Sequence, residues 1–143
     1  MVRGFNIPGK IKSKQRPRFN GKYAYTPKET VDYENWVKSC YLIRYTEEKP
    51  LEIPLAINII AYYEIPKSTS KKRKQQMLDG EIFPTIKPDV DNIAKSILDA
   101  LNGIAYKDDK QIVDLRVRKM YSDTPGVSVW ITEVKQWIVN IEK

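Results

Sequence analysis

The chain has 143 residues and a formal net charge of +7, with 25 lysines and arginines against 18 aspartates and glutamates. It has no histidine and a single cysteine, Cys40, which excludes catalytic triads that use imidazole, zinc sites built from histidine and cysteine, and disulfides within the chain. No GxGxxG run, P-loop, signal-peptide pattern or membrane-spanning apolar stretch occurs, so we expect one cytoplasmic domain over residues 1–143.

The N-terminal segment, residues 1–28, contains eight basic residues and no acidic one, so the whole excess of positive charge lies there. Five of these residues alternate with other residues and would project to one side of an extended chain: Lys10, Lys12, Lys14, Arg16 and Arg18. Lys22, Tyr23 and Tyr25 follow. Basic side chains beside aromatic ones are typical of a groove that binds nucleic acid, so we expect the five residues and Lys22 to contact DNA. The alternative is a solvated edge strand or loop.

A helix is predicted from Pro27 to Tyr45, because Thr26-Pro27-Lys28-Glu29 has the pattern of a capping box with proline at the first helical position. Its inward side is expected to include Cys40, as a core residue and not a nucleophile, together with Val31, Trp36, Val37 and Tyr41. The next stretch, Leu51 to Tyr63, is rich in isoleucine and tyrosine and predicts a strand.

Residues 66–88 are polar and interrupted by Gly80, Pro84 and Pro88, which indicates a mobile insertion. Its centre, Ser70 to Asp79, is either a short helix that ends at Gly80 or a loop. The insertion also contains a basic run that is either a second DNA contact, which we favour, or a solvated surface: Lys71, Lys72, Arg73 and Lys74.

The strongest helical pattern extends from Asp91 to Leu101, with apolar residues on one side and Asp91, Lys95 and Asp99 at i, i+4 spacing on the other. Ile112–Met120 and Val127–Glu133 then alternate apolar and polar residues, which predicts a β-hairpin with one face on the core. The expected fold is therefore a single α/β (α+β) domain, a mixed sheet of about four to five strands with two main helices packed on it.

Six of the nine aspartates of this basic chain lie between Asp89 and Asp114. Gathered carboxylates repel one another, and a divalent cation held by oxygen ligands relieves that repulsion. An acidic pocket in a basic protein suits cleavage of a phosphate backbone by metal-activated water. Asp89 and Asp91 also fit a capped helix start, and Asp108-Asp109 also fits a solvated turn. We expect the Asp108-Asp109 loop to return to the same end of the sheet as Asp89 and Asp91.

Five short motifs follow one another along the chain: Arg16-Pro-Arg-Phe, Tyr25-Thr-Pro, Pro88-Asp-x-Asp-Asn-x-x-Lys95, Asp99-Ala-Leu and Asp108-Asp109-x-Gln-Ile-Val. In this combination the chain closely resembles the RusA family of Holliday junction resolvases, which are common in phages and prophages. The resemblance covers most of the chain. It implies a Mg²⁺-dependent crossover junction endodeoxyribonuclease of DNA recombination and repair, with Mn²⁺ as a substitute ion, that acts as a homodimer on four-way DNA junctions. It maps the catalytic, metal-binding aspartates onto Asp89, Asp91 and Asp109, with Asp108 as the alternative third ligand, and the catalytic lysine onto Lys95.

In this interpretation the ion would lower the pKa of a bound water from about 15.7 toward neutrality. Lys95 would hold the scissile phosphate, neutralise the transition state or assist the leaving 3′ oxygen, or else form an ion pair with Asp91 or Asp99. Asp99 and Asp114 are expected to have supporting or structural roles. The alternatives are a structure-selective nuclease for flaps or forks, a non-catalytic DNA-binding module and a nucleotide-sugar glycosyltransferase. Apolar surface for a dimer interface is expected near Trp130 and Trp137 or on the outward face of the Leu51–Tyr63 strand.

Overall fold

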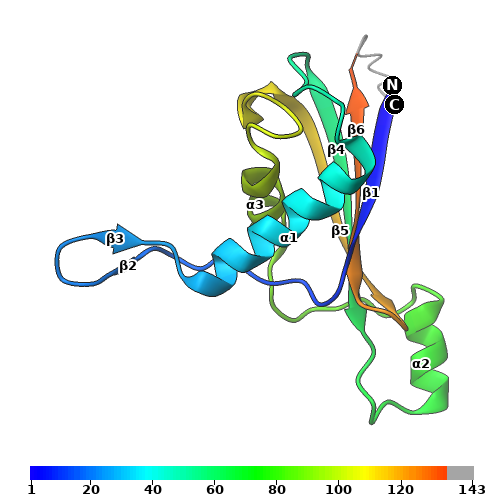
Figure 1. Cartoon of the computed structure of the whole chain (residues 1–143). Coiled ribbons are helices and arrows are strands. Elements are labelled where there is room, and N and C mark those ends of the chain that lie inside the picture. The colour runs from blue at the N-terminus through cyan, green and yellow to red at the C-terminus, as the bar shows by residue number, and fades with distance from the viewer. Residues whose placement is uncertain (135–143) are drawn as a thin grey trace, which may run out of the picture.

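The computed structural model describes residues 1–134, which fold around a four-stranded sheet (Figure 1). The strands β1 (Val2–Pro8), β4 (Leu55–Glu64), β5 (Ile112–Ser122) and β6 (Gly126–Glu133) lie in the order β1-β6-β4-β5. β4 pairs antiparallel with β6 and parallel with β5, so the sheet is mixed, as predicted. A separate two-stranded ribbon is formed by β2 (Arg18–Phe19) and β3 (Ala24–Tyr25).

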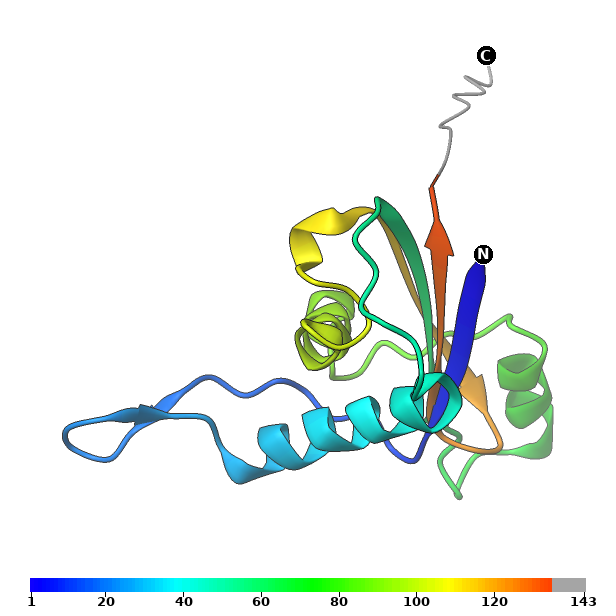
Figure 2. The same cartoon turned by 45° about the horizontal axis from the view of Figure 1, so that its top comes forward.

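Helices α1 (Lys28–Tyr45) and α3 (Val90–Leu101) pack on one face of the sheet and on each other (Figures 1 and 2). Their apolar side chains meet the alternate residues of β4 that face them. The core between the layers includes Val37 and Tyr41 from α1, Ile93 and Ile97 from α3, and Leu55, Ile57 and Ile59 from β4. The predicted α+β class, with two main helices on a mixed sheet, is confirmed.

The N-terminal part of α1 differs from the prediction. Pro27 occupies the N-cap position without a side-chain hydrogen bond, and Glu29 accepts a hydrogen bond from Gln15 (3.2 Å) instead of completing a capping box. Val31 and Trp36 are 40% and 43% exposed. The inward stripe runs instead through Thr30, Tyr33, Val37 and Cys40, spaced three or four residues apart, and through Tyr41, four residues after Val37, so that all five share one face of the helix. Cys40 is buried, as expected, and its burial raises the pKa of its thiol.

The predicted hairpin between the last two strands is wrong, because β4 lies between β5 and β6. Ile57 of β4 pairs with Leu115 on one side and with Ile131 on the other. Alternation of apolar and polar residues shows that a segment is a strand with one buried face, but not which strand lies next to it. The most apolar strand, β4, takes the central position, and β5 becomes an edge with Val113 and Leu115 exposed.

The insertion contains the short helix α2 (Lys71–Leu78), so the helical alternative is confirmed. The Ser70 hydroxyl accepts a hydrogen bond from the backbone N–H of Arg73 (3.3 Å), and the helix ends before Gly80, whose φ of 77° favours glycine. α2 packs near the end of β5, away from α1 and α3 (Figure 1). The helices of residues 1–134 include none with the length and apolarity to cross a bilayer.

Trp130, one of the residues expected near a dimer interface, is 37% exposed on β6. Trp137 lies outside the described residues.

Candidate active site

Asp89 and Asp91 lie at the N-terminus of α3, and both are exposed. Asp89 occupies the N-cap position, yet its side chain accepts no capping hydrogen bond. Neither carboxylate forms an ion pair within residues 1–134. The partial positive charge of the helix N-terminus favours negative charge here. The two carboxylates, two residues apart in the chain, are therefore exposed and open to a cation.

The entry to α3 is fixed by Tyr63 at the end of β4. The Tyr63 hydroxyl donates a hydrogen bond to the carbonyl oxygen of Pro88 (2.8 Å), and both residues are buried. Burial and, to a smaller extent, the charge of Asp89 raise the pKa of Tyr63 to about 12. Tyr63 therefore remains a neutral donor near pH 7 and holds the residue that precedes Asp89 against the sheet.

Lys95 lies one helical turn after Asp91 and is exposed. It forms no ion pair within residues 1–134, so the expected alternative of a pair with Asp91 or Asp99 is not present. Asp99 instead binds Lys14, which also lies 3.3 Å from Glu34 of α1. Burial acts to lower the pKa of Lys14, but the two carboxylates raise it overall, so this lysine keeps its charge.

Asp108 and Asp109 lie at the start of β5. The Asp108 carboxylate accepts a hydrogen bond from the backbone N–H of Lys110 (2.9 Å), which lowers the pKa of Asp108. Gln111 accepts from the Asp108 backbone (2.9 Å) and donates to the carbonyl oxygens of Leu51 (2.8 Å) and Ile53 (3.1 Å). Asp108 is thus used to cap a short 3-10 turn that is fixed to the chain just before β4.

Asp109 has a different environment from Asp108. Desolvation raises the pKa of Asp109, and the neighbouring Asp108 and Asp99 raise it further. Asp109 therefore lies near enough to Asp108 and Asp99 for their charges to act on it, and within residues 1–134 its carboxylate accepts no hydrogen bond from the backbone of another residue like the one that Lys110 donates to Asp108.

The two groups of aspartates lie at opposite ends of α3. Pro88 contacts Tyr63 near the end of β4, whereas Gln111 contacts the residues just before its start. α3 has 12 residues and therefore spans about 18 Å. The expected return of the Asp108-Asp109 loop to the end of the sheet near Asp89 is wrong, because β4 and β5 are parallel and begin at the same edge, so α3 leads from the end of β4 back to the start of β5. Residues 1–134 contain no group of three or more potential ligands that could hold a metal.

The basic N-terminal segment is attached to the helices and then leaves the body of the molecule. Ser96 of α3 donates to the carbonyl oxygen of Lys12 (3.1 Å), and the Gln15 backbone donates to Thr30 of α1 (3.1 Å). Beyond Gln15 the chain projects as an arm (residues 16–27) that ends in the β2–β3 ribbon (Figures 1 and 2). The expected one-sided row does not form, because Lys14 points into a carboxylate pair while the other four residues of the row, and Lys22 after them, are exposed: Lys10, Lys12, Arg16, Arg18 and Lys22.

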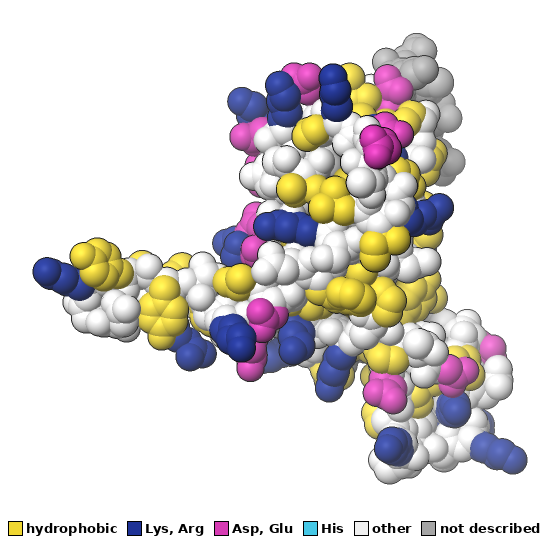
Figure 3. Space-filling model, viewed as in Figure 1, with side chains coloured by type: hydrophobic (Ala, Val, Ile, Leu, Met, Phe, Trp, Pro, Cys, Tyr) yellow, Lys and Arg dark blue, Asp and Glu magenta, His cyan; other side chains and the backbone are white. Residues whose placement is uncertain are grey.

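Basic side chains are visible both on the arm and on α2 (Figure 3). Lys71, Lys72 and Arg73 are exposed, and Lys74 is exposed but lies 3.4 Å from Asp123. Phe19 and Tyr23 of the arm are 78% and 69% exposed. The arm thus combines cations with aromatic rings, as the sequence predicts.

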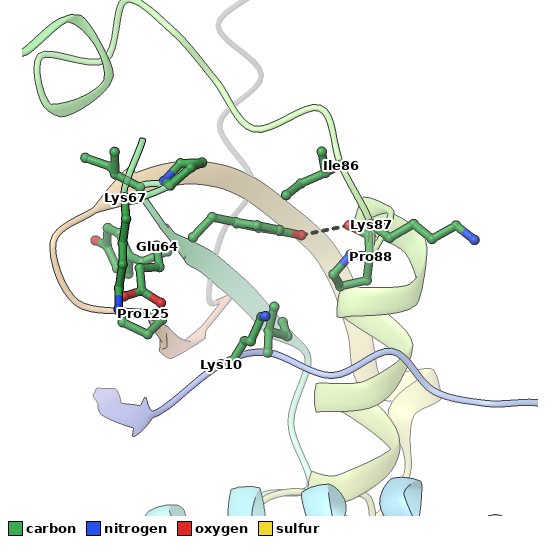
Figure 4. A pocket seen from close by; sticks show the side chains of 12 residues that line it. Lys10, Glu64, Lys67, Ile86, Lys87, Pro88 and Pro125 are labelled. Carbon is green, nitrogen blue, oxygen red and sulfur yellow. Dashed lines mark hydrogen bonds between the residues drawn. The ribbon is translucent and has the colours of Figure 1, made fainter. Parts of the chain in front are cut away.

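A cavity of about 270 Å³ that reaches Pro88, the residue before Asp89, was not predicted from the sequence (Figure 4). It is lined by four segments that are distant along the chain: residues 10–11, 62–67, 86–88 and 125. No local motif marks these residues, because only the fold brings them together.

Comparison with known proteins gives a family match and two similar chains. The family model described as endodeoxyribonuclease RusA matches residues 8–132. "Uncharacterized protein YqaN" of Bacillus subtilis (strain 168) is 38% identical over 136 residues, which cover 91% of this chain and 95% of that protein. "Crossover junction endodeoxyribonuclease rusA" of Lactococcus phage r1t is 32% identical over 83 residues, which cover 57% of this chain and 56% of the phage protein.

Proposed function

Because this chain belongs to the RusA family of endodeoxyribonucleases, whose model matches residues 8–132, we propose that it resolves four-way DNA junctions by hydrolysing phosphodiester bonds. The name of the Lactococcus phage relative, a crossover junction endodeoxyribonuclease, supports the junction as substrate. The observation that carries the proposal is the exposed pair Asp89 and Asp91, which lies inside the family match and has no capping bond or ion pair within the described residues. The enzyme would act in recombination and repair in the cytoplasm.

The donor chemistry of the Asp89 and Asp91 pair fits Mg²⁺, which is usually bound through one or two carboxylates together with waters and phosphate oxygens. Asp89 and Asp91 would hold the ion, and Mn²⁺ would substitute for it. When bound, the ion supplies an activated water at neutral pH and positive charge beside the phosphate. Lys95, exposed and one turn after Asp91, would hold the scissile phosphate and stabilise the charge that develops on it.

The third aspartate is best assigned to Asp109. The Asp108 carboxylate is engaged by the Lys110 backbone, while Asp109 is not so engaged. Asp109 lies at the other end of α3 from Asp91, so a single chain does not bring the three aspartates together. We propose that a homodimer does so, with Asp109 of one chain approaching Asp89 and Asp91 of the other. A two-fold axis would then produce two equivalent sites for two matched cuts.

The exposed basic residues would bind the DNA backbone. On the arm and the segment before it these are Lys10, Lys12, Arg16, Arg18 and Lys22, and on α2 they are Lys71, Lys72, Arg73 and Lys74. We assign Lys14 a different role from the one its spacing predicts. Because it pairs with Asp99 and Glu34, it would fix the start of the arm to α3 and α1 and not bind phosphate.

Purified protein incubated with labelled four-way, three-way and linear duplex DNA in Mg²⁺ tests this function. Paired symmetric nicks in the four-way junction are expected. Equal cleavage of flaps or forks would favour a general structure-selective nuclease. Binding without cleavage in either Mg²⁺ or Mn²⁺ would favour a non-catalytic DNA-binding module.

A further inference from the structure

The cavity beside Asp89 is mostly apolar. Seen closely, it lies between the end of β4 and the segment that leads into α3 (Figure 4). Its apolar lining comes from the rings of Tyr62 and Tyr63 and from Ile11, Ile65, Pro66, Ile86, Pro88 and Pro125. Pockets for drug-sized ligands begin at roughly 300 Å³, so a cavity of about 270 Å³ suits a smaller flat group such as one ring system.

The charged groups of the cavity are mostly cationic. Lys10, Lys67 and Lys87 line it, against one carboxylate, Glu64. The side chains of Lys10 and Lys67 lie at the cavity, while that of Lys87 points away from it (Figure 4). An apolar space with cations at its mouth fits an uncharged ring joined to phosphate groups, which is the chemistry of one nucleotide in a single strand.

The cavity is held in a fixed position relative to the candidate catalytic aspartates. Tyr63 is 8% exposed and donates its hydroxyl to the Pro88 carbonyl (2.8 Å). The Lys119 ammonium donates to the Ile86 carbonyl and lies 5.1 Å from the centre of the Tyr63 ring. Pro88 lines the cavity and directly precedes Asp89, so the cavity adjoins the position where the proposed function places a DNA phosphate.

We propose that this cavity binds one unstacked nucleobase of the strand that is cut, with Lys10 and Lys67 contacting the phosphates on either side of it. The inference rests on the proposed function, since it requires DNA at Asp89. Removing a base from the stack costs least where the base is already unpaired or poorly stacked, as at a branch point. The cavity would therefore favour branched DNA over linear duplex.

The test uses the full-length protein and four-way junctions that lack a single base at each nucleotide around the crossover in turn. Binding is measured without added Mg²⁺, so that no strand is cut. Loss of one stacked base is expected to weaken binding by roughly fivefold to a hundredfold at one position. A 2-aminopurine placed at that position should become more fluorescent on binding, because it leaves the base stack.

Two matched variants link this position to the cavity. Ile86→Trp fills the cavity at an exposed residue (58% exposed), and Ile43→Trp places the same side chain on α1 at a residue that is 76% exposed. Ile86→Trp should bind the intact junction more weakly and no longer distinguish the abasic one, while Ile43→Trp should behave as the wild type.

The outcomes separate this inference from the proposed function. Wild-type protein that binds the intact junction tightly but shows no sensitive position, and no 2-aminopurine signal, would overturn the nucleobase site alone. An abasic effect that persists fully in Ile86→Trp would also overturn it. Failure of wild-type protein to bind any four-way junction would overturn the proposed function, and the nucleobase site with it.

Discussion

Asp89 and Asp108 each occupy the N-cap position of a helical segment, but only the Asp108 carboxylate accepts a capping hydrogen bond. The motif from Pro88 to Lys95 indicates either a metal ligand pair or a well-capped helix start, and the residue types fit both. Only the structure shows that Asp89 makes no capping hydrogen bond, whereas Asp108 does cap a turn. Lys14 illustrates the same limit, because its partners Asp99 and Glu34 are 85 and 20 positions away in the sequence.

Asp91→Asn is expected to separate binding from cleavage. It removes one ligand charge and weakens the binding of the ion, so cleavage should fall by at least 100-fold, while junction binding should persist because repulsion of DNA decreases. Single-turnover cleavage and a gel-shift titration measure the two effects. Asp32→Asn, which changes an exposed aspartate of α1, is the matched control and should cleave normally. Wild-type cleavage by Asp91→Asn at saturating Mg²⁺ would show that Asp91 is not a ligand.

Lys14→Met and Lys12→Met should affect different properties, the first the stability of the fold and the second the binding of DNA. Lys14→Met leaves Asp99 and Glu34 beside each other without their shared cation, and it should lower the free energy of unfolding by about 1 kcal/mol. Its effect on the salt dependence of DNA binding should be small. Lys12→Met, at an exposed residue, should leave stability unchanged and reduce the slope of log affinity against log salt by roughly 0.9. Urea denaturation and salt titrations provide the two measurements, and equal effects of both variants would contradict the distinct role of Lys14.

At the scale of elements, the local patterns predicted the helices well and the strand neighbours poorly. The predicted bounds of α3 are correct to within one residue at its start, because its 3.6-residue periodicity and the terminating Gly103 are both local features of the sequence. The pairing of β4 with both β5 and β6 is non-local, and alternation along each strand has no information about it. The cavity was missed for the same reason, since its lining comes from four separate segments.

The arm is the element whose DNA contact can be tested most directly. Arg16→Ala combined with Arg18→Ala should flatten the dependence of log affinity on log salt by roughly 0.9 for each phosphate contact that is lost. The rate of cleavage at saturating protein should change little, because the arm projects away from α3 (Figure 2). Lys49→Ala combined with Lys107→Ala, two exposed lysines outside the arm, is the control. An unchanged slope in the arm variant would show that these arginines face only solvent.

At the scale of the whole molecule, the order and direction of the strands determine which aspartates a single chain can bring together. The helix between the parallel strands β4 and β5 separates Asp89 and Asp91 from Asp109, and no rotation of side chains removes a separation of this length. The spacing of the motifs predicted that the three aspartates would meet. That prediction failed because a motif gives the order of residues along the chain but not the direction of the chain in space. Under the proposed function, a second copy of the chain is the simplest source of the third aspartate, because it also provides a second site.

This arrangement predicts complementation between two inactive variants. Asp91→Asn and Asp109→Asn should each be inactive alone. In a mixed dimer, one site combines both changes, but the other combines intact Asp89 and Asp91 of the second chain with intact Asp109 of the first. With random exchange, half of the dimers are mixed and have one working site, so nicking should recover to about a quarter of the wild-type rate.

The products distinguish this outcome from contamination or from a site within one chain. On a cruciform plasmid the mixed dimer should give nicked circles without direct linear product, because only one of its two sites is intact. Sedimentation at micromolar concentration should show a dimer for each variant alone and for the mixture. A mixture that sediments as a dimer yet remains as inactive as its components would place Asp109 outside the shared site, and a strictly monomeric protein on the junction would exclude paired cutting.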